Sequence, residues 1–220
     1  AVQATTSAGR EIIQAILDQI HMWQDKESAA GSRTTGRPFV TVAFAQSLDG
    51  KIAAFVDQDQ KTTTSNLPLS GEESLLLTHA LRSIHDRILI GGRTLSLDCP
   101  RLTNRLWKPE SCKSPRPVVL DTSLEYIHEL GETKRVRNPI VCCSREAMPS
   151  DALIPPDVEL LPCRCDSSGH LSLVHVLEQL KSRHGIQTLM VEGGASVLAT
   201  FFQEDLVDCL CITIASKLIG

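Results

Sequence analysis

The chain has 220 residues, a length that suits one large domain or two small ones and allows a sizeable buried core. Hydrophobic residues make up 42% and charged residues 22%, and the formal net charge of −4 excludes the global basic field that attracts nucleic acid or acidic lipid. No apolar run approaches the length needed to span a bilayer, so we expect neither a nucleic-acid nor a membrane partner.

The N-terminal part is predicted to be a helix followed by a linker. Apolar residues recur at helical spacing within residues 10–23 and share one face, namely Ile12, Ile13, Ile16, Leu17 and Ile20. The segment KESAAGSRTTGRP then has the composition of a flexible linker. We therefore divide the chain into an N-terminal helix with its linker, residues 1–36, and a main domain, residues 37–220.

The main domain is expected to open with a strand over residues 39–47, which are rich in apolar and β-branched side chains and end at an Asp-Gly turn. Polar residues 57–66 predict a loop. A helix follows, with Ser70 as its N-cap and Glu73 at the capping-box spacing. A short buried strand over residues 86–92 ends in two glycines, and residues 93–107 are expected to be irregular.

The second half alternates short apolar runs with amphipathic segments. The predicted strands cover residues 116–121, 138–144, 158–163, 186–194 and 206–216. The predicted helices cover residues 170–185, ending at Gly185, and residues 195–205. This alternation is typical of an α/β protein with a mostly parallel central sheet flanked by helices on both faces.

Eight cysteines could form disulfides or remain reduced. Most lie in strand-like runs such as IVCCS and DCLCITI, where a free cysteine behaves as a small buried hydrophobe. No C-x-x-C pair occurs and the seven histidines do not fall at zinc-ligand spacing, so we expect no metal site and reduced cysteines in a cytoplasmic protein. Because the chain begins at Ala1 and not at methionine, an organellar leader upstream is left open.

Three predicted strands end in glycine or polar residues, in the sequences AQSLDGK, LIGGRTLSLD and MVEGGAS. Each could be an ordinary turn. Open parallel sheets, however, bind ligands beyond the carboxyl ends of their strands, and three such ends together favour a binding site.

Two of these ends suit phosphate groups. Gly91 and Gly92 allow a phosphate to approach the backbone, and an arginine and a hydroxyl follow directly at Arg93 and Thr94. After the last glycine pair, Gly193–Ser196 would open a helix whose N–H groups and dipole suit a pyrophosphate. Neither a P-loop nor G-x-G-x-x-G is present, and no Ser-His-Asp set is legible, so these residues predict nucleotide or phosphate binding without indicating a reaction.

Together these motifs resemble the reductase family of riboflavin biosynthesis, which includes the C-terminal domain of bifunctional deaminase–reductases and the stand-alone diaminopyrimidine reductases. The resemblance rests on RPFVTVAFAQSLDGKIA, LSGEESLLLTHALRSIHDRILIGGRT, LDCPRLTNR and LMVEGGASVLATFF, in that order. It implies a dihydrofolate-reductase-like fold and a homodimer. It also implies NADPH-dependent reduction of 2,5-diamino-6-ribosylamino-4(3H)-pyrimidinone 5′-phosphate, with hydride transfer to C1′ of the ring-opened imine.

The resemblance also implies residue roles. The cofactor-binding residues would be Thr94, Asp98, Glu192, Gly193, Gly194, Ala195 and Ser196. The substrate-binding residues would be Ser47, Asp49, Lys51, Ser70, Arg101, Leu102 and Arg105. Lys51 and Glu192 are the catalytic candidates, with Glu192 near the reacting amine, and Arg105 is expected to bind the 5′-phosphate.

Two departures from the family pattern stand out. Arg93 replaces a glycine that many members carry, a change that could favour NADPH over NADH or reshape the loop. Members usually continue beyond KLIG with more sheet, so the reductase domain, residues 37–220, is expected to be short at its C-terminus.

Several alternatives remain. The zinc signature of a deaminase half is absent from the chain, which favours the stand-alone type and reduction before deamination. The deaminated 5-amino-6-ribosylaminouracil phosphate is the alternative substrate. A dihydrofolate reductase would need no phosphate clamp, so the presence of Arg101 and Arg105 argues against this alternative. A non-catalytic nucleotide-binding module would have no reason to retain both the cofactor motif and the substrate motif, and this chain has both.

Overall fold

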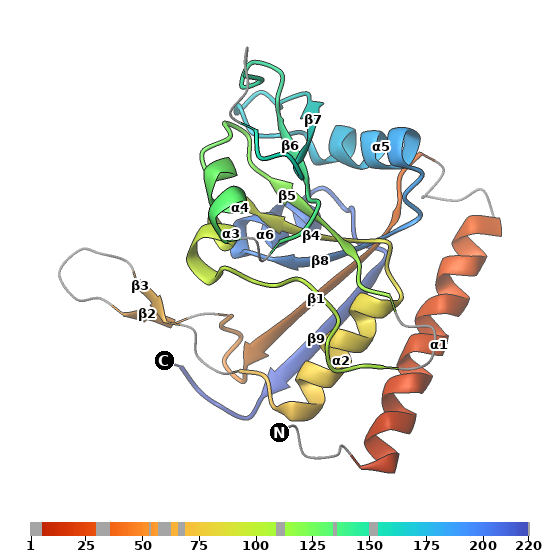
Figure 1. Cartoon of the computed structure of the whole chain (residues 1–220). Coiled ribbons are helices and arrows are strands. Elements are labelled where there is room, and N and C mark those ends of the chain that lie inside the picture. The colour runs from red at the N-terminus through yellow and green to blue at the C-terminus, as the bar shows by residue number, and fades with distance from the viewer. Residues whose placement is uncertain are drawn as a thin grey trace.

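The computed structural model describes residues 6–29, 36–52, 54–56, 63–65, 69–108, 113–133, 136–149 and 154–219. Within them, seven strands form one parallel sheet in the order β7-β6-β5-β4-β8-β1-β9 (Figure 1). The strands are β1 (Phe39–Ser47), β4 (Arg87–Gly91), β5 (Arg116–Leu120), β6 (Ile140–Ser144), β7 (Glu159–Cys163), β8 (Thr188–Gly193) and β9 (Cys209–Ala215). The predicted strands of a mostly parallel sheet are therefore confirmed.

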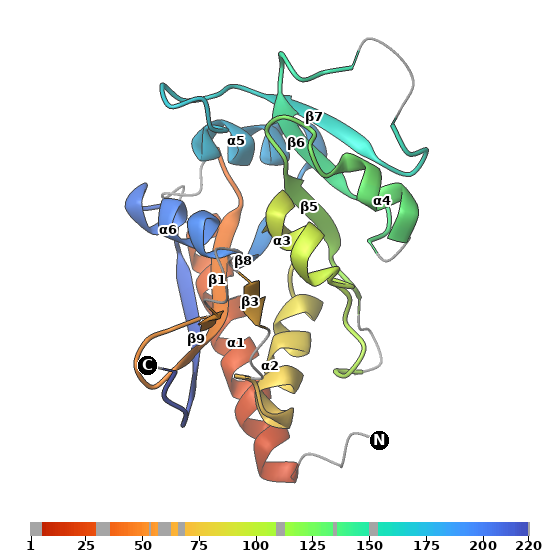
Figure 2. The same cartoon turned by 90° about the vertical axis from the view of Figure 1, so that its left-hand side faces the viewer.

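Six helices pack on this sheet in the described part of the chain. They are α1 (Ser7–Ala29), α2 (Glu72–Ser83), α3 (Gly92–Asp98), α4 (Ile127–Thr133), α5 (Leu173–His184) and α6 (Ala195–Gln203). Side chains of α5 and α6 join the apolar cluster on one face, whereas α1 to α4 contribute to the clusters on the other face. Figure 2 shows α6 and α2 on opposite sides of the strands. None of the described helices is long and apolar enough to cross a membrane.

Successive side chains of a strand point to opposite faces of the sheet, so strand residues belong alternately to the two apolar layers. Val40, Leu89 and Val191 belong to the cluster under α5 and α6. Ile88 packs with α3, and Met190 packs with α1 and α2. Nearly every position of the central strands is thus buried, which explains why these strands appear in the sequence as continuous apolar runs.

The N-terminal helix is part of this packing. α1 contacts α2 and buries Ile13, Leu17 and Ile20 against it. Ile12, which the periodicity placed on the same face, is 62% exposed, because it lies at the edge of the apolar stripe. The linker residues 30–35 lie outside the described part of the chain.

The predicted end of one helix, at Gly185, is confirmed, and the predicted N-cap of another, at Ser70, is wrong. Ser172 caps α5 by accepting a hydrogen bond from the backbone N–H of His175, and α5 ends at Gly185 in the left-handed conformation. Ser70 does not cap α2, whose N-cap is Gly71 with no side-chain hydrogen bond. The helix begins one residue later than predicted, and Glu72 and Glu73 instead place acidic charge in its first turn.

Four short elements were not predicted from the sequence. α3 lies in the segment expected to be irregular, α4 was not predicted, and β2 (Ala54–Val56) pairs with β3 (Thr63–Ser65) across a stretch expected to be a loop. Seven-residue helices and three-residue strands contain too few residues to display a period.

A buried histidine ties α2 to the sheet. His85 is 4% exposed, and its Nδ1 lies 2.7 Å from the Leu81 carbonyl oxygen and its Nε2 2.8 Å from Thr41 Oγ1. Burial is the main cause that lowers the pKa of His85 to about 4. The folded chain therefore keeps this ring neutral at pH values where the unfolded chain protonates it.

Acid should consequently destabilise the protein through His85. Between the ordinary pKa of 6.5 and about 4 only the unfolded state binds the extra proton, so stability is lost as the pH falls through this window. Between about pH 7 and about pH 5 the loss should be about 2 kcal/mol for this residue. Urea unfolding at both pH values should show a smaller loss in His85→Leu and an unchanged loss in His170→Gln, an exposed control. An equal pH dependence in His85→Leu and wild type would contradict this origin.

Candidate functional site

At the carboxyl ends of the neighbouring parallel strands β4 and β8, the chain continues toward opposite faces of the sheet. β4 continues into α3 on one face of the sheet and then to β5, whereas β8 continues into α6 on the other face and then to β9. Such a switch point is the general ligand site of open parallel sheets. Two of the three predicted strand ends meet here.

The glycines at this switch point allow the β4–α3 and β8–α6 turns to pack closely against each other. A Cβ atom on Gly194 would lie 2.8 Å from Thr94 Oγ1, and one on Gly91 would lie 3.1 Å from Val197 Cγ2. A Cβ atom on Gly92 would lie 2.6 Å from Tyr126 Cδ2. We expected a phosphate to approach the backbone at Gly91 and Gly92. The side chains of Val197 and Tyr126 instead occupy the space beside these glycines.

The β8–α6 turn leaves the first backbone N–H groups of α6 without a side-chain cap. Gly193 has a φ of +124°, a conformation that other residues rarely adopt, and the Gly193–Gly194 peptide bond is cis. No side chain caps α6 at Gly194, and its first residues, Ala195 and Ser196, are exposed. Uncapped N–H groups at the start of a nine-residue helix suit an anionic group.

Glu192 occupies an irregularity of the sheet. Leu89 pairs with Val191 but Ile90 pairs with Gly193, so Glu192 is the extra residue of a bulge in β8. Bulges redirect a side chain, and here the carboxylate meets the guanidinium of Arg82 at the end of α2. Arg82 Nε donates to Glu192 Oε1 at 2.7 Å and Nη2 donates to Oε2 at 2.6 Å. The two side chains are only 11% and 15% exposed.

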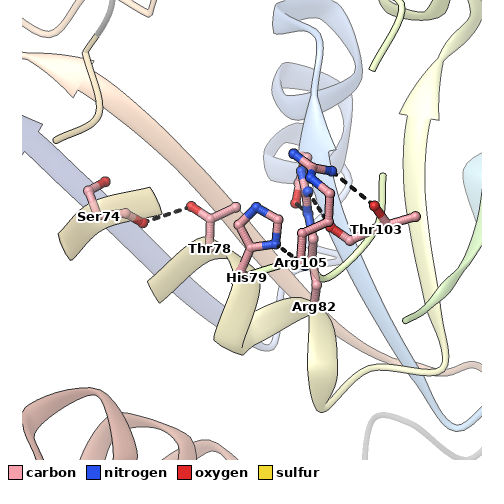
Figure 3. Close-up of polar contacts among 7 residues, drawn as sticks. Ser74, Thr78, His79, Arg82, Thr103 and Arg105 are labelled. Atoms are coloured by element: carbon pink, nitrogen blue, oxygen red, sulfur yellow. Dashed lines mark hydrogen bonds and ion pairs between the residues drawn. The ribbon is translucent and has the colours of Figure 1, made fainter. Parts of the chain in front are cut away.

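Helix α2 also holds the arginine segment, residues 101–105, which carries the predicted phosphate-binding residues Arg101 and Arg105 (Figure 3). Arg82 Nη1 donates to the Thr103 carbonyl oxygen at 3.0 Å, and the backbone N–H of Arg105 donates to His79 Nδ1 at 2.9 Å. The exposed Arg105 guanidinium donates to Thr103 Oγ1 at 2.9 Å. Burial first, and then Arg82 and Arg101, lower the pKa of Arg105, so cationic groups gather here. Such a cluster suits a phosphate.

Leu102 differs from the other predicted substrate residues, because its side chain is 1% exposed and packs with Ile88 and Leu95. It anchors the segment between the exposed Arg101 and Arg105. Any contact of Leu102 with a substrate would have to use its backbone.

The third strand end lies farther along the sheet. Val42 pairs with Val191, so Ser47 lies about five residues, or roughly 16 Å, beyond that pair along β1. Ser47 Oγ accepts from the backbone N–H of Lys51, and Asp49 accepts from the N–H of Ile219 and lies 3.8 Å from Lys51 Nζ. This turn is therefore hydrogen-bonded to the C-terminal segment and lies apart from the Arg82–Glu192 pair.

Ser70 lies at the same end of the molecule as Ser47. It lines a cavity of about 870 Å³ between α1, the start of α2 and the end of β9, and Ala215 in this lining pairs with Ser47. Arg82, at the far end of α2, is about 18 Å away along the helix axis. The predicted substrate residues thus form two groups, one around Arg105 and one around Ser47 and Ser70.

The predicted cofactor residues form one group around the β4–α3 and β8–α6 turns. Glu192 and the residues Gly193–Ser196 lie in one turn, and Thr94 lies against Gly194. Asp98 is exposed at the end of α3, about one helical turn beyond Thr94. An uncapped helix start, a nearby hydroxyl and the exposed Arg93 fit the phosphates of a nicotinamide dinucleotide.

Arg82, His79 and Thr103 were not predicted as site residues from the sequence. The available signal was the spacing of His79 and Arg82, three residues apart on the side of α2 that otherwise carries buried Leu76 and Ala80. Polar groups on a buried helix face need partners, and both partners come from segments distant in sequence.

Comparison with known proteins identifies the family. The model of the RibD C-terminal domain matches residues 38–220. The 2,5-diamino-6-ribosylamino-4(3H)-pyrimidinone 5′-phosphate reductase of Eremothecium gossypii is 38% identical over 200 residues, which cover 83% of this chain and 75% of that protein. The protein of the same name from Saccharomyces cerevisiae is 32% identical, with 88% of this chain and 78% of that protein covered.

Solved structures of proteins with related sequences have a similar fold. The S. cerevisiae riboflavin biosynthesis reductase Rib7 has a TM-score of 0.64 at 30% identity over 88% of this chain and 80% of that chain. A Thermotoga maritima deaminase/reductase has the same TM-score at 26% identity, and this chain spans 48% of it. The dihydrofolate-reductase-like fold expected from the motifs is confirmed, and the chain belongs to the RibD C-terminal domain family of riboflavin biosynthesis reductases.

Proposed function

We propose that the protein catalyses the NADPH-dependent reduction of 2,5-diamino-6-ribosylamino-4(3H)-pyrimidinone 5′-phosphate to its ribitylamino product. The observation that carries this proposal is the position of Glu192, which joins the nucleotide-binding turn to the arginine segment through Arg82. A carboxylate between a dinucleotide site and a phosphate site suits a reaction that needs two ligands held in contact. The relatives that bear this substrate's name support the choice of pyrimidine.

Bound NADPH would supply the hydride for C1′ of the ring-opened imine, and a proton from water or a side chain completes the reduction of the C=N bond to an amine. Uncapped N–H groups at the start of α6 would bind the pyrophosphate, and Thr94 and Asp98 would contact the neighbouring part of the dinucleotide. Arg93, exposed beside Thr94, is our choice for the 2′-phosphate that distinguishes NADPH from NADH.

On the substrate side, Arg105 and Arg101 would bind the 5′-phosphate, and Glu192 would accept a hydrogen bond from the ribosylamino nitrogen near C1′. The pyrimidine would extend toward Ser47, Asp49 and Ser70. Lys51 lies on this distant turn, so we assign it to pyrimidine binding and not to proton transfer at C1′.

A homodimer is the oligomeric state we propose, supported by the edge strand β9. Its residues Leu210, Ile212 and Ile214 are 46%, 40% and 60% exposed and lie on one face of the strand. An apolar edge strand of this kind is usually covered by another chain or segment.

The function is tested by the loss of NADPH absorbance with the diamino substrate, the deaminated substrate and dihydrofolate in parallel. We expect oxidation with the diamino compound. Preference for the deaminated compound would reverse the order of reduction and deamination, and oxidation with dihydrofolate alone would contradict the proposal.

The assignment of the two half-sites is tested by Arg105→Ala. Loss of a charge-assisted phosphate contact should raise the KM for the phosphorylated substrate roughly tenfold to a hundredfold. The affinity for NADPH, measured by its fluorescence, should stay nearly unchanged. Arg116→Ala, at the start of β5, is the control and should alter neither value. An equal loss of NADPH and substrate affinity in Arg105→Ala would show that the half-sites are wrongly assigned.

The bond between Arg82 and Glu192 should contribute to stability as well as to activity. Arg82→Met leaves a nearly buried carboxylate without its partner and should lower the free energy of unfolding by about 3–5 kcal/mol. The double variant with Glu192→Gln should lose less than the sum of the single variants, as measured by urea unfolding. The exposed pair Arg164–Glu178 is the control, with an expected coupling of about 0–1 kcal/mol. Additive effects of Arg82→Met and Glu192→Gln would contradict this interpretation.

A further inference from the structure

His79 combines deep burial with a hydrogen bond to the backbone of the arginine segment. It lies in α2, is 3% exposed, and accepts the backbone N–H of Arg105 at Nδ1 over 2.9 Å. A ring that accepts at Nδ1 must be neutral and carry its proton at Nε2. The contact reaches the residue whose guanidinium we assign to the substrate phosphate.

The surroundings of His79 oppose its protonation. Burial, Arg82 and Arg105 together lower the pKa of His79 to about 4, in that order of size, and only the hydrogen bond with the Asn104 side chain acts in the other direction. An imidazolium would also turn its Nδ1–H toward the Arg105 N–H, where no acceptor would remain for either donor. The acceptor is therefore present throughout the neutral pH range.

Helix α2 thereby holds this segment at two points. Arg82 binds the Thr103 carbonyl oxygen and His79, three residues earlier, binds the Arg105 N–H. Thr103 Oγ1 in turn accepts from the Arg105 guanidinium, so the backbone and the side chain of Arg105 are both fixed (Figure 3). A fixed guanidinium loses less conformational entropy when it binds an anion.

We propose that His79 is a positioning residue for phosphate recognition: its neutral imidazole fixes the backbone of Arg105, so that the Arg105 guanidinium is oriented toward the 5′-phosphate before the substrate binds. The proposal rests on the assignment of Arg105 to the substrate phosphate. It differs from a purely structural role because it predicts a selective loss of phosphate affinity.

His79→Leu removes the acceptor at similar volume, and His79→Asn keeps an oxygen near the position of Nδ1. His175 supplies a matched control on α5, since it is 6% exposed and its Nδ1 accepts the backbone N–H of Arg164 at 3.1 Å. His79→Leu and His175→Leu each lose one part-buried hydrogen bond from a backbone N–H to Nδ1. Only His79→Leu loses it next to the arginine segment.

The first readout is binding of ribose 5-phosphate and of ribose by calorimetry, which requires no turnover. We expect His79→Leu to weaken ribose 5-phosphate binding about fivefold to tenfold, with ribose and NADPH binding unchanged. His79→Asn should restore most of the loss, and His175→Leu should lose stability but no phosphate affinity. Hydrogen exchange of residues 101–107 should quicken in His79→Leu alone.

The second readout is the KM for the phosphorylated pyrimidine, which should rise by the same factor in His79→Leu while kcat changes little. Unchanged ribose 5-phosphate affinity in His79→Leu, equal losses for ribose and its phosphate, or no recovery in His79→Asn would each overturn the proposal. If His79→Leu does not fold, His79→Ala carries the same expectations. Absence of turnover in the wild type, with selective phosphate loss in His79→Leu, would refute the proposed function and leave the role of His79 intact.

Discussion

The paired hydrogen bonds between Arg82 and Glu192 are the constraint on which the site depends. They connect the end of α2 to a bulge in β8, and through Thr103 the same guanidinium reaches the arginine segment. Three segments distant in sequence are thereby fixed around one carboxylate. Because both side chains are mostly buried, neither can be released without leaving a charge unpaired.

The glycines at the ends of β4 and β8 allow this arrangement because they are small. Thr94 lies against Gly194 and Val197 lies against Gly91, so the two turns can pack closely at the switch point of the sheet. Gly193 adds a conformation that other residues rarely adopt. The VEGG sequence therefore combines a redirected acid, a tight turn and an uncapped helix start within four residues.

Much of the fold could be predicted from the sequence because buried parallel strands form continuous apolar runs and α5 has a recognisable stop at Gly185. α3 and α4 could not be predicted, since seven residues do not establish a period. Ser70 satisfied the capping pattern, yet α2 begins one residue later. The candidate residues at the strand ends followed from the rule for parallel sheets, whereas Arg82 and His79 act through partners that only the tertiary structure brings near.

The most direct measurement is a crystal structure with NADP⁺ and ribose 5-phosphate bound together. The dinucleotide should lie with its pyrophosphate on the first turn of α6, the sugar phosphate should lie on Arg105, and Glu192 should lie where the two ligands meet. A dinucleotide bound along the Arg101–Arg105 segment, or in the cavity between α1, α2 and β9, would contradict the proposed division of the site.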